Sequence, residues 1–341
     1  MRILFIAPRA MGTTNPNRQL TTFHETDVRI LRELGHDVTV LPWHGHPYGR
    51  LVRSIVRQDL VFCWTIGDHS ALGLALAKAR HIPFLCVIGG YEFANLPELE
   101  YGNLATTRGH ILSSFVYSRA DALLYVDPSL MHEAHAAFGQ RTLFETESSG
   151  EFNTNEVYVP TGYDTEYWSP NGRDREDLVV TVCHAPGWNR YVLKGVGKFV
   201  NMAEWMPEYE FHIAGEVPPD AIPGAPRNVS FDGWLERDAV RDLYRRAKVY
   251  CQFSMHEGLP NALCEAMACG CVPVGTPVNG IPTAIGNAGC IADDFLGISA
   301  GIGIAARASP KMRERARNRI VSLFPLSRRR DELRAILERF A

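Results

Sequence analysis

The chain lacks an apolar run long enough to cross a bilayer. Its 341 residues contain no uninterrupted stretch of about eighteen apolar residues, the length that a spanning helix needs. Any membrane association is therefore expected to be at most peripheral. The opening segment Met1–Ile6 reaches Pro8 before a charged and then apolar signal region could form. We therefore expect a cytoplasmic protein, for which the inner face of the membrane is the place of any peripheral contact.

The chain also lacks an excess of charge of either sign. Its 35 Lys and Arg residues stand against 38 Asp and Glu residues, for a formal net charge of −3. This near balance argues against the broad basic surface of nucleic-acid-binding proteins, so no nucleic-acid partner is expected. One local basic cluster, Arg328 to Arg330, is interpreted as a solvated helix end, with contact to an acidic membrane surface as the alternative.

Cysteine is present, but not in a metal-binding pattern. None of the eight cysteines belongs to a Cys-x2-Cys pair, and most lie inside apolar runs such as Leu60–Trp64. In such runs cysteine usually acts as a small buried residue. The histidine pairs His44/His46 and His132/His135 have no carboxylate at a convincing ligand spacing, so we interpret them as surface residues. The sequence predicts reduced, packed thiols and no metal site.

What the chain does have is an alternation of short apolar runs with longer amphipathic ones. This rhythm is typical of a parallel sheet whose strands are connected by helices. It occurs twice, separated by a polar and Pro/Gly/Asp-rich segment that ends near Asp177. The length also favours two domains over one. The expected strands include residues 3–6, 38–41, 60–64, 84–88, 122–126, 178–182, 210–214, 229–231 and 249–253, and the expected helices include 22–34, 103–119 and 194–205.

The most informative segment is His256–Gly270, which carries two carboxylates eight residues apart, Glu257 and Glu265. Between them, a Gly-Leu-Pro-Asn sequence marks a loop that turns into a helix. The start of a helix leaves backbone amides unpaired and attracts anions. We therefore expect Glu257 before the helix, at the mouth of a site, and Glu265 about two turns further in. The four linking residues are Gly258, Leu259, Pro260 and Asn261.

This segment resembles the Glu-x7-Glu signature of family-4 glycosyltransferases, which have the GT-B fold and retain anomeric configuration. The likeness covers most of the chain; the other matching segments are residues 87–92, 97–102, 159–164, 228–234, 242–247, 249–254, 273–276 and 280–282. The resemblance implies an α/β GT-B architecture, with two Rossmann-like doubly wound domains facing a cleft. Expected boundaries are 1–165 for the acceptor-binding domain, 166–325 for the nucleotide-sugar-binding domain, and 326–341 for a C-terminal helix that crosses back to the first domain.

Cationic side chains are expected where the leaving diphosphate would lie. Arg190 and Lys194 follow the first strand of the second domain, and open parallel sheets bind ligands beyond the carboxyl ends of their strands. Two cations there could neutralise the diphosphate without a metal. The family usually has Gly-Arg-Leu just before this point, where this chain has Cys183–Ala185. That departure leaves Arg190 equally open to interpretation as a solvated residue.

The resemblance also implies roles for the remaining candidates. Glu257 would bind the hydroxyls of the donor sugar and is grouped with Lys194 and Arg190 as catalytic, while Glu265 would hold the ribose diol. The other residues expected to bind the donor are Gly258, Leu259, Pro260, Asn261, Gly12 and Gly233. The residues expected on the acceptor side are Gly90, Tyr91 and Glu92, where Glu92 replaces the usual Asp. Trp234, beside Gly233, is interpreted as a packing residue.

The expected function is retaining, metal-independent transfer of a hexose from a UDP- or GDP-sugar to a glycan, a lipid-linked acceptor or a small hydroxylated molecule. No cofactor is expected besides this nucleotide-sugar co-substrate. A GT-B-shaped epimerase or phosphorylase is one alternative. A protein that binds nucleotide sugars without catalysis is another, and turnover in an acceptor screen would separate it from an enzyme.

Overall fold

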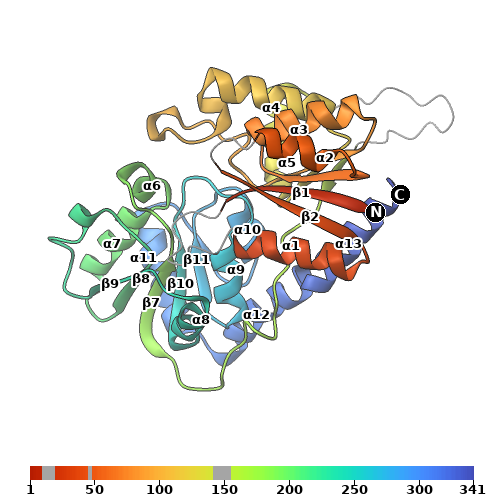
Figure 1. The fold of residues 1–341 in the computed structure, drawn as a ribbon. Coiled ribbons are helices and arrows are strands. Elements are labelled where there is room, and N and C mark those ends of the chain that lie inside the picture. Colours follow the sequence, from red (N-terminus) through yellow and green to blue (C-terminus); the bar gives the residue numbers. More distant parts are fainter. Residues whose placement is uncertain (10–19, 45–47, 141–154) are drawn as a thin grey trace. The chain divides into compact units, whose positions relative to one another are not determined.

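A computed structural model of the chain describes residues 1–9, 20–44, 48–140 and 155–341. These residues form two compact units, shown in Figure 1. Unit 1 comprises residues 1–160 and 329–341, and unit 2 comprises residues 161–328. The sequence predicted divisions after residues 165 and 325, and the two units divide after residues 160 and 328.

Unit 1 is built on a six-stranded parallel sheet with the order β2-β1-β3-β4-β5-β6. Every residue of the central strands β3, β4 and β5 is buried, which explains why their sequences are continuous apolar runs without alternation. The strands are β1 (Arg2–Pro8), β2 (Asp37–Trp43), β3 (Leu60–Trp64), β4 (Phe84–Ile88), β5 (Ala122–Tyr125) and β6 (Glu156–Tyr158). The helices are α1 (Thr22–Glu33), α2 (Tyr48–Ile55), α3 (Asp68–Ala79), α4 (Thr107–Arg119), α5 (Pro128–Phe138) and most of α13 (Leu326–Glu338).

The helix predicted over residues 103–119 begins later than expected. Residues 103–105 form a separate 3-10 turn, and α4 starts only after Thr106. The Thr106 hydroxyl accepts a hydrogen bond from the Gly109 amide at 3.0 Å, which caps the first turn of α4. A second 3-10 turn spans Pro97–Leu99. The sequence pattern missed this break because a capping threonine can also stand inside a helix.

Unit 2 has its own six-stranded parallel sheet, with the order β12-β11-β10-β7-β8-β9. The chain runs outward through β7, β8 and β9, and then returns to the other side of β7 at β10. In open α/β sheets, ligands bind at such a reversal, beyond the carboxyl ends of the two strands. The strands are β7 (Glu176–Val182), β8 (Glu210–Ala214), β9 (Val229–Gly233), β10 (Ala247–Gln252), β11 (Val272–Gly275) and β12 (Cys290–Ile291).

The helices of unit 2 are α6 (Trp188–Leu193), α7 (Val196–Trp205), α8 (Arg237–Arg246), α9 (Asn261–Ala268), α10 (Gly280–Ile285), α11 (Phe295–Ala306) and α12 (Pro310–Leu323); a 3-10 turn spans Pro219–Ala221. The core of the unit gathers the apolar faces of α7 and α11 on the buried strands β7, β8, β10 and β11. The two parallel sheets confirm the predicted α/β class with two Rossmann-like halves.

The basic cluster Arg328 to Arg330 differs from its expected role as a solvated helix end. Arg329 is 2% exposed and forms a two-pronged ion pair with Asp27 of α1, with Nη2 2.7 Å from Oδ2. Its Nη1 donates to the carbonyl oxygens of Val159 and Pro160, and the Trp64 indole donates to Asp27 at 2.8 Å. Residues 329–341 are therefore anchored to unit 1 by a paired and fully hydrogen-bonded buried charge.

All eight cysteines are free thiols, and six of them are buried, which confirms the packed thiols expected from the sequence. Within the residues that the structure describes, no helix is both long enough and apolar enough to cross a membrane.

Candidate functional site

Two of the predicted residues meet at the chain reversal of unit 2. Lys194 follows β7, Glu257 follows β10, and the Lys194 Nζ lies 2.6 Å from Glu257 Oε1. The side chains are 23% and 12% exposed, so the ion pair is mostly shielded from water but still reachable by a ligand. β7 and β10 are adjacent in the sheet, which brings together residues that are 63 positions apart.

Glu257 is held by two further donors that the sequence interpretation missed. Gln252 Nε2 and Ser254 Oγ donate to the same carboxylate oxygen, Oε1, at 3.1 and 2.7 Å. Gln252 also receives a hydrogen bond from the Tyr250 hydroxyl at 2.9 Å. Tyr250, Gln252 and Ser254 are alternate residues along β10 and its extension, so they share one face of the sheet. Polar residues at this spacing inside a buried strand were the signal in the sequence.

Lys194 is positioned by a junction between two helices, where the sequence predicted one. The helix expected over 194–205 begins two residues later, as α7 after Gly195, whose φ is +67°, and a separate helix that the sequence did not predict, α6, ends at Leu193. A Cβ at Gly195 would lie 2.0 Å from the carbonyl oxygen of Phe253. Close by, the Met255 amide donates to the Leu193 carbonyl at 2.8 Å. These contacts fix the loop after β10 against the α6–α7 junction. Because Glu257 follows β10 and Lys194 lies in the junction, the contacts also fix these two residues relative to each other.

Replacing Gly195 with alanine is expected to disturb this junction and destabilise unit 2. The left-handed backbone alone costs an alanine about 1–2 kcal/mol, and the contact with Phe253 requires the two segments to separate. Gly197→Ala, in the first turn of α7, is the matched control, because a Cβ there meets only the Tyr191 ring of α6, at 3.4 Å. Chemical denaturation should show a loss for Gly195→Ala and a gain of about 0.5–1 kcal/mol for Gly197→Ala. Equal stability of the two variants would contradict the close approach.

The start of α9 offers unpaired backbone amides, as the sequence predicted. Pro260 is the N-cap residue, one position earlier than the first helical position, and the first bond within the helix runs from the Cys264 amide to the Pro260 carbonyl at 3.2 Å. The three preceding amides therefore belong to the end of α9 that attracts anions. The carbonyl oxygen of Gly258 packs closely on Gly280, since a Cβ at Gly280 would lie 2.2 Å from it. Leu259 is 4% exposed.

Asn261, the first residue of α9, has a structural contact. Its Oδ1 accepts a hydrogen bond from the Tyr163 hydroxyl at 2.9 Å, and Thr161 bonds to the same hydroxyl at 2.8 Å. The side chain of Asn261 is therefore used within unit 2. The group of Asn261 that remains for the predicted contact with the nucleotide sugar is its backbone amide.

Glu265 lies in the second turn of α9, near three buried tyrosines. Burial raises the pKa of its carboxyl group to about 8, against the opposing charge of Arg237. Its charge in turn acts on the hydroxyls of Tyr163, Tyr244 and Tyr250, whose pKa values are raised mainly by their own burial. Burial therefore favours the protonated form of the Glu265 carboxyl group. The sequence interpretation had expected an ionised carboxylate.

The other candidates of unit 2 lie at the ends of β7, β8 and β9. Gly233 ends β9 with a φ of +66°, and its carbonyl oxygen accepts from the Gly215 amide at 2.7 Å. Trp234 packs edge-on against His184, with 6.1 Å between the ring centroids, in agreement with a packing role. Arg190 is exposed on α6, and its backbone carbonyl accepts a hydrogen bond from the Lys194 amide at 2.9 Å.

The candidates of unit 1 are arranged differently from their expected role. Glu92 is fully buried, and its Oε2 accepts hydrogen bonds from the amides of Gly89 and Gly90 at 3.1 and 2.7 Å. In this arrangement the carboxylate closes the turn that follows β4, and the contact of Glu92 with an acceptor stays a prediction. Tyr91 remains 39% exposed and packs edge-on against Tyr101. Gly12 lies outside the described residues.

The histidine pairs also differ in part from their expected surface positions. His132 is exposed, whereas His135 is half-buried and bonds to Glu156 at 3.0 Å. His44 lies in the described part of the chain and His46 outside it. Across the described residues, no group of three or more His, Cys, Asp or Glu side chains is arranged to hold a metal ion.

Known proteins support both the fold and the resemblance. Residues 188–303, all in unit 2, match the family model described as glycosyl transferases, group 1. HepE of Anabaena, solved in complex with UDP-glucose, is similar with a TM-score of 0.75 and 12% identity, over 99% of this chain and 100% of that chain. A sucrose-phosphate synthase from Thermosynechococcus elongatus has a TM-score of 0.71 and 13% identity, over 99% of both chains.

A glycosyltransferase from Rickettsia africae is similar with a TM-score of 0.67 and 13% identity, over 99% of this chain and 98% of that chain. At such low identity these likenesses establish the fold, and together with the family match they confirm the predicted resemblance to GT-B glycosyltransferases. A comparison with curated protein sequences finds no match.

Proposed function

We propose that this chain is a retaining glycosyltransferase that moves a hexose from a nucleotide sugar to a glycan, a lipid-linked acceptor or a small hydroxylated molecule. The observation that carries the proposal is the ion pair of Lys194 and Glu257 at the chain reversal of unit 2, together with the unpaired amides at the start of α9. A cation and a helix N-terminus bind phosphate, while a carboxylate binds sugar hydroxyls.

In this proposal Lys194 stabilises the diphosphate as negative charge develops on it. The bond from the anomeric carbon to the diphosphate oxygen breaks, and the acceptor oxygen forms its new bond to the same carbon. The acceptor proton passes to the departing diphosphate, so no separate base is needed. The positive charge comes from Lys194 and the α9 amides, which supports a metal-independent reaction. Glu257, fixed by Gln252 and Ser254, orients the donor sugar.

UDP-glucose is the first donor to test, because HepE, which shares the fold, was solved with that molecule. Glu265 would bind the ribose diol, which is common to UDP- and GDP-sugars. The proposal therefore includes both donor classes. Gly90 and Tyr91 of unit 1 stay the proposed acceptor contacts.

The experiment that tests this function is a turnover assay with UDP- and GDP-sugars and a panel of hydroxylated acceptors, with and without EDTA. We expect EDTA-resistant release of the nucleotide diphosphate, together with a new glycoside whose proton NMR coupling at the anomeric carbon matches the configuration of the donor. An inverted product would contradict retention, and an epimerised sugar nucleotide would favour the epimerase alternative. Binding of the donor without any product would favour a protein that only binds nucleotide sugars.

A further inference from the structure

Unit 2 contains a cavity that the proposed transfer reaction does not use. It has a volume of about 630 Å³, within the range of small-molecule sites. Its lining residues include Arg175, which directly precedes β7, Lys248 near the start of β10, and Gly270 just before β11. The cavity therefore lies at the amino edge of the sheet. Lys194 and Glu257 follow the carboxyl ends of the same strands, about 20 Å away along strands of six or seven residues.

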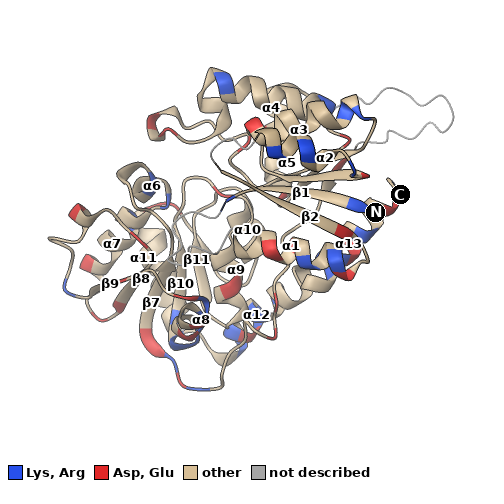
Figure 2. Ribbon diagram, viewed as in Figure 1, with Lys and Arg blue, Asp and Glu red and all other residues tan. Residues whose placement is uncertain are grey.

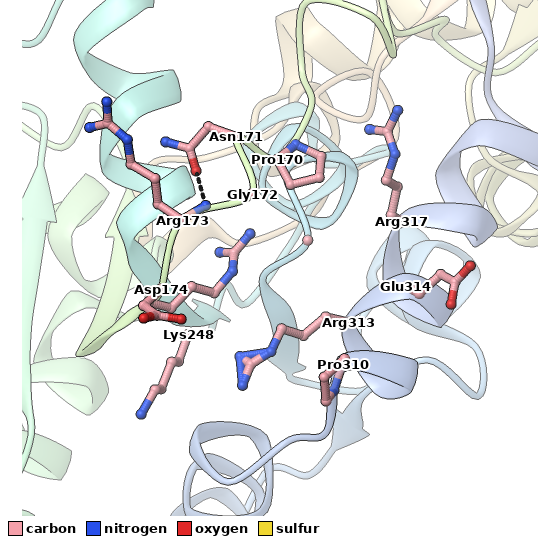
Figure 3. Close-up of a pocket in the computed structure, with 12 residues that line it drawn as sticks. Pro170, Asn171, Gly172, Arg173, Asp174, Lys248, Pro310, Arg313, Glu314 and Arg317 are labelled. Atoms are coloured by element: carbon pink, nitrogen blue, oxygen red, sulfur yellow. Dashed lines mark hydrogen bonds between the residues drawn. The ribbon is translucent and has the colours of Figure 1, made fainter.

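The cavity is strongly basic. Its lining contains five cations, Arg173, Arg175, Lys248, Arg313 and Arg317, against two carboxylates, Asp174 and Glu314. Figure 3 shows Arg313 extending from α12 across the cavity, whereas Arg317 and Glu314 turn away from it. Figure 2 shows Lys and Arg along α12 and in the segment that leads into β7.

The partners of these cations leave much of the positive charge uncompensated. Lys248 is paired with Asp177 at 2.6 Å, but the Arg175 guanidinium donates to the carbonyl oxygens of Tyr244, Ala247 and Cys269, which carry no net charge. Arg317 similarly donates to carbonyl oxygens. Carbonyl partners satisfy the hydrogen bonds of a guanidinium without neutralising it.

Besides the positive charge of the lining, a terminal nitrogen of Arg313 that lacks a hydrogen-bond partner in the described part of the chain points to a ligand. Its Nη2 donates to the Ala308 carbonyl at 2.6 Å, whereas its Nη1 is buried and has no hydrogen-bond partner among the described residues. A guanidinium nitrogen without a partner is costly, and a turn of the side chain into the cavity would bring Nη1 to a ligand oxygen. Desolvation and the nearby charge of Arg175 lower the pKa of Arg313, as expected for two cations that share a cavity without an anion. Arg313 also lies in the first turn of α12, at the positive end of the helix dipole.

We propose that this cavity is a second binding site, for a small phosphorylated metabolite that carries two or more negative charges, such as a sugar phosphate or a nucleoside monophosphate. A guanidinium binds a phosphoryl group with two parallel hydrogen bonds, so Arg313 and the neighbouring cations recognise the phosphoryl group itself. This inference is independent of the transfer reaction, since none of the lining residues belongs to the proposed donor site.

The test is a calorimetric and thermal-shift titration of the full chain with pyrophosphate, glucose 6-phosphate and adenosine monophosphate. Pyrophosphate alone measures recognition of the phosphoryl groups, and the other two probes distinguish a sugar phosphate from a nucleotide. We expect Arg313→Gln to weaken binding at least tenfold, and Arg315→Gln, exposed on the same helix and outside the cavity, to leave it unchanged. Lys194→Ala should also retain this binding, which separates the cavity from the donor site.

The melting temperature without ligand shows whether Arg313 is merely structural. If Arg313 serves the ligand, Arg313→Gln removes a repulsion with Arg175, so the ligand-free variant should melt at the same or a higher temperature while losing the shift caused by pyrophosphate. A lower melting temperature with an unchanged pyrophosphate shift would overturn the proposal. So would the absence of binding by all three probes at millimolar concentration, or equal binding by both arginine variants.

Discussion

Replacing Lys194 with alanine is expected to lower kcat for sugar transfer by about 10²–10³-fold, the usual effect of losing one preorganised group that stabilises transition-state charge. The expectation follows from the position of Nζ, 2.6 Å from Glu257 Oε1 beyond adjacent strands of the sheet. Steady-state kinetics with a saturating acceptor measures it. The remaining donors to Glu257, Gln252 and Ser254, are unchanged in this variant, so the carboxylate keeps two of its three partners.

Lys198→Ala is the matched control for this variant. Lys198 is exposed on α7, four residues after Lys194, and it has the same charge. Its removal therefore changes the net charge of unit 2 equally without touching Glu257. If the two lysine variants lose activity to the same small extent, Lys194 has no special role and the proposed diphosphate contact is wrong.

Above pH 8, Glu265→Gln is expected to have a free energy of unfolding about 2–4 kcal/mol higher than the wild type, while binding nucleotide sugars more weakly. The pKa of Glu265 is raised to about 8 by burial, against about 4.3 in an unfolded chain. Between these values the folded protein holds a proton that the unfolded chain has lost, so the wild-type stability falls as pH rises from 4.3 to 8. Glutamine cannot lose a proton there, and the variant avoids that loss. Chemical denaturation at pH 4.5, 7 and 9 measures the difference.

The same titration predicts how donor binding depends on pH. If the ribose hydroxyls donate to an ionised Glu265, affinity for UDP-glucose should rise toward pH 8 and level off above it, by no more than about tenfold per pH unit. The Glu265→Gln variant should bind more weakly at every pH and without this rise. Glu204→Gln, exposed on α7, is the control. A flat affinity profile in the wild type would show that the carboxyl group does not ionise on binding.

The elements that sequence alone predicted best are those whose pattern is local. The buried strands Leu60–Trp64 and Phe84–Ile88 have the bounds expected, because a continuous apolar run bounded by polar residues can form little else in an α/β sheet. The position of Glu257 before α9 also follows from a local signal, the Gly-Leu-Pro-Asn turn. These features depend on residues only a few positions apart.

The features that the sequence did not predict depend on residues far apart in the chain. The helix break at Gly195 exists because the backbone there touches Phe253, 58 positions away, and helical periodicity carries no sign of that contact. Arg329 is buried because Asp27, 302 positions away, pairs with it. Glu92 has local partners, yet the sequence could not show whether its carboxylate turns toward its own amides or toward a ligand.

The donor site at the chain reversal of unit 2 is best tested by calorimetry, which gives the affinity for UDP-glucose of the wild-type protein and of the Lys194→Ala, Glu265→Ala and Lys198→Ala variants. We predict at least tenfold weaker binding for the first two variants, unchanged binding for Lys198→Ala, and an intact fold in all of them by circular dichroism. Unchanged affinity in both Lys194→Ala and Glu265→Ala would contradict the donor site at the chain reversal of unit 2.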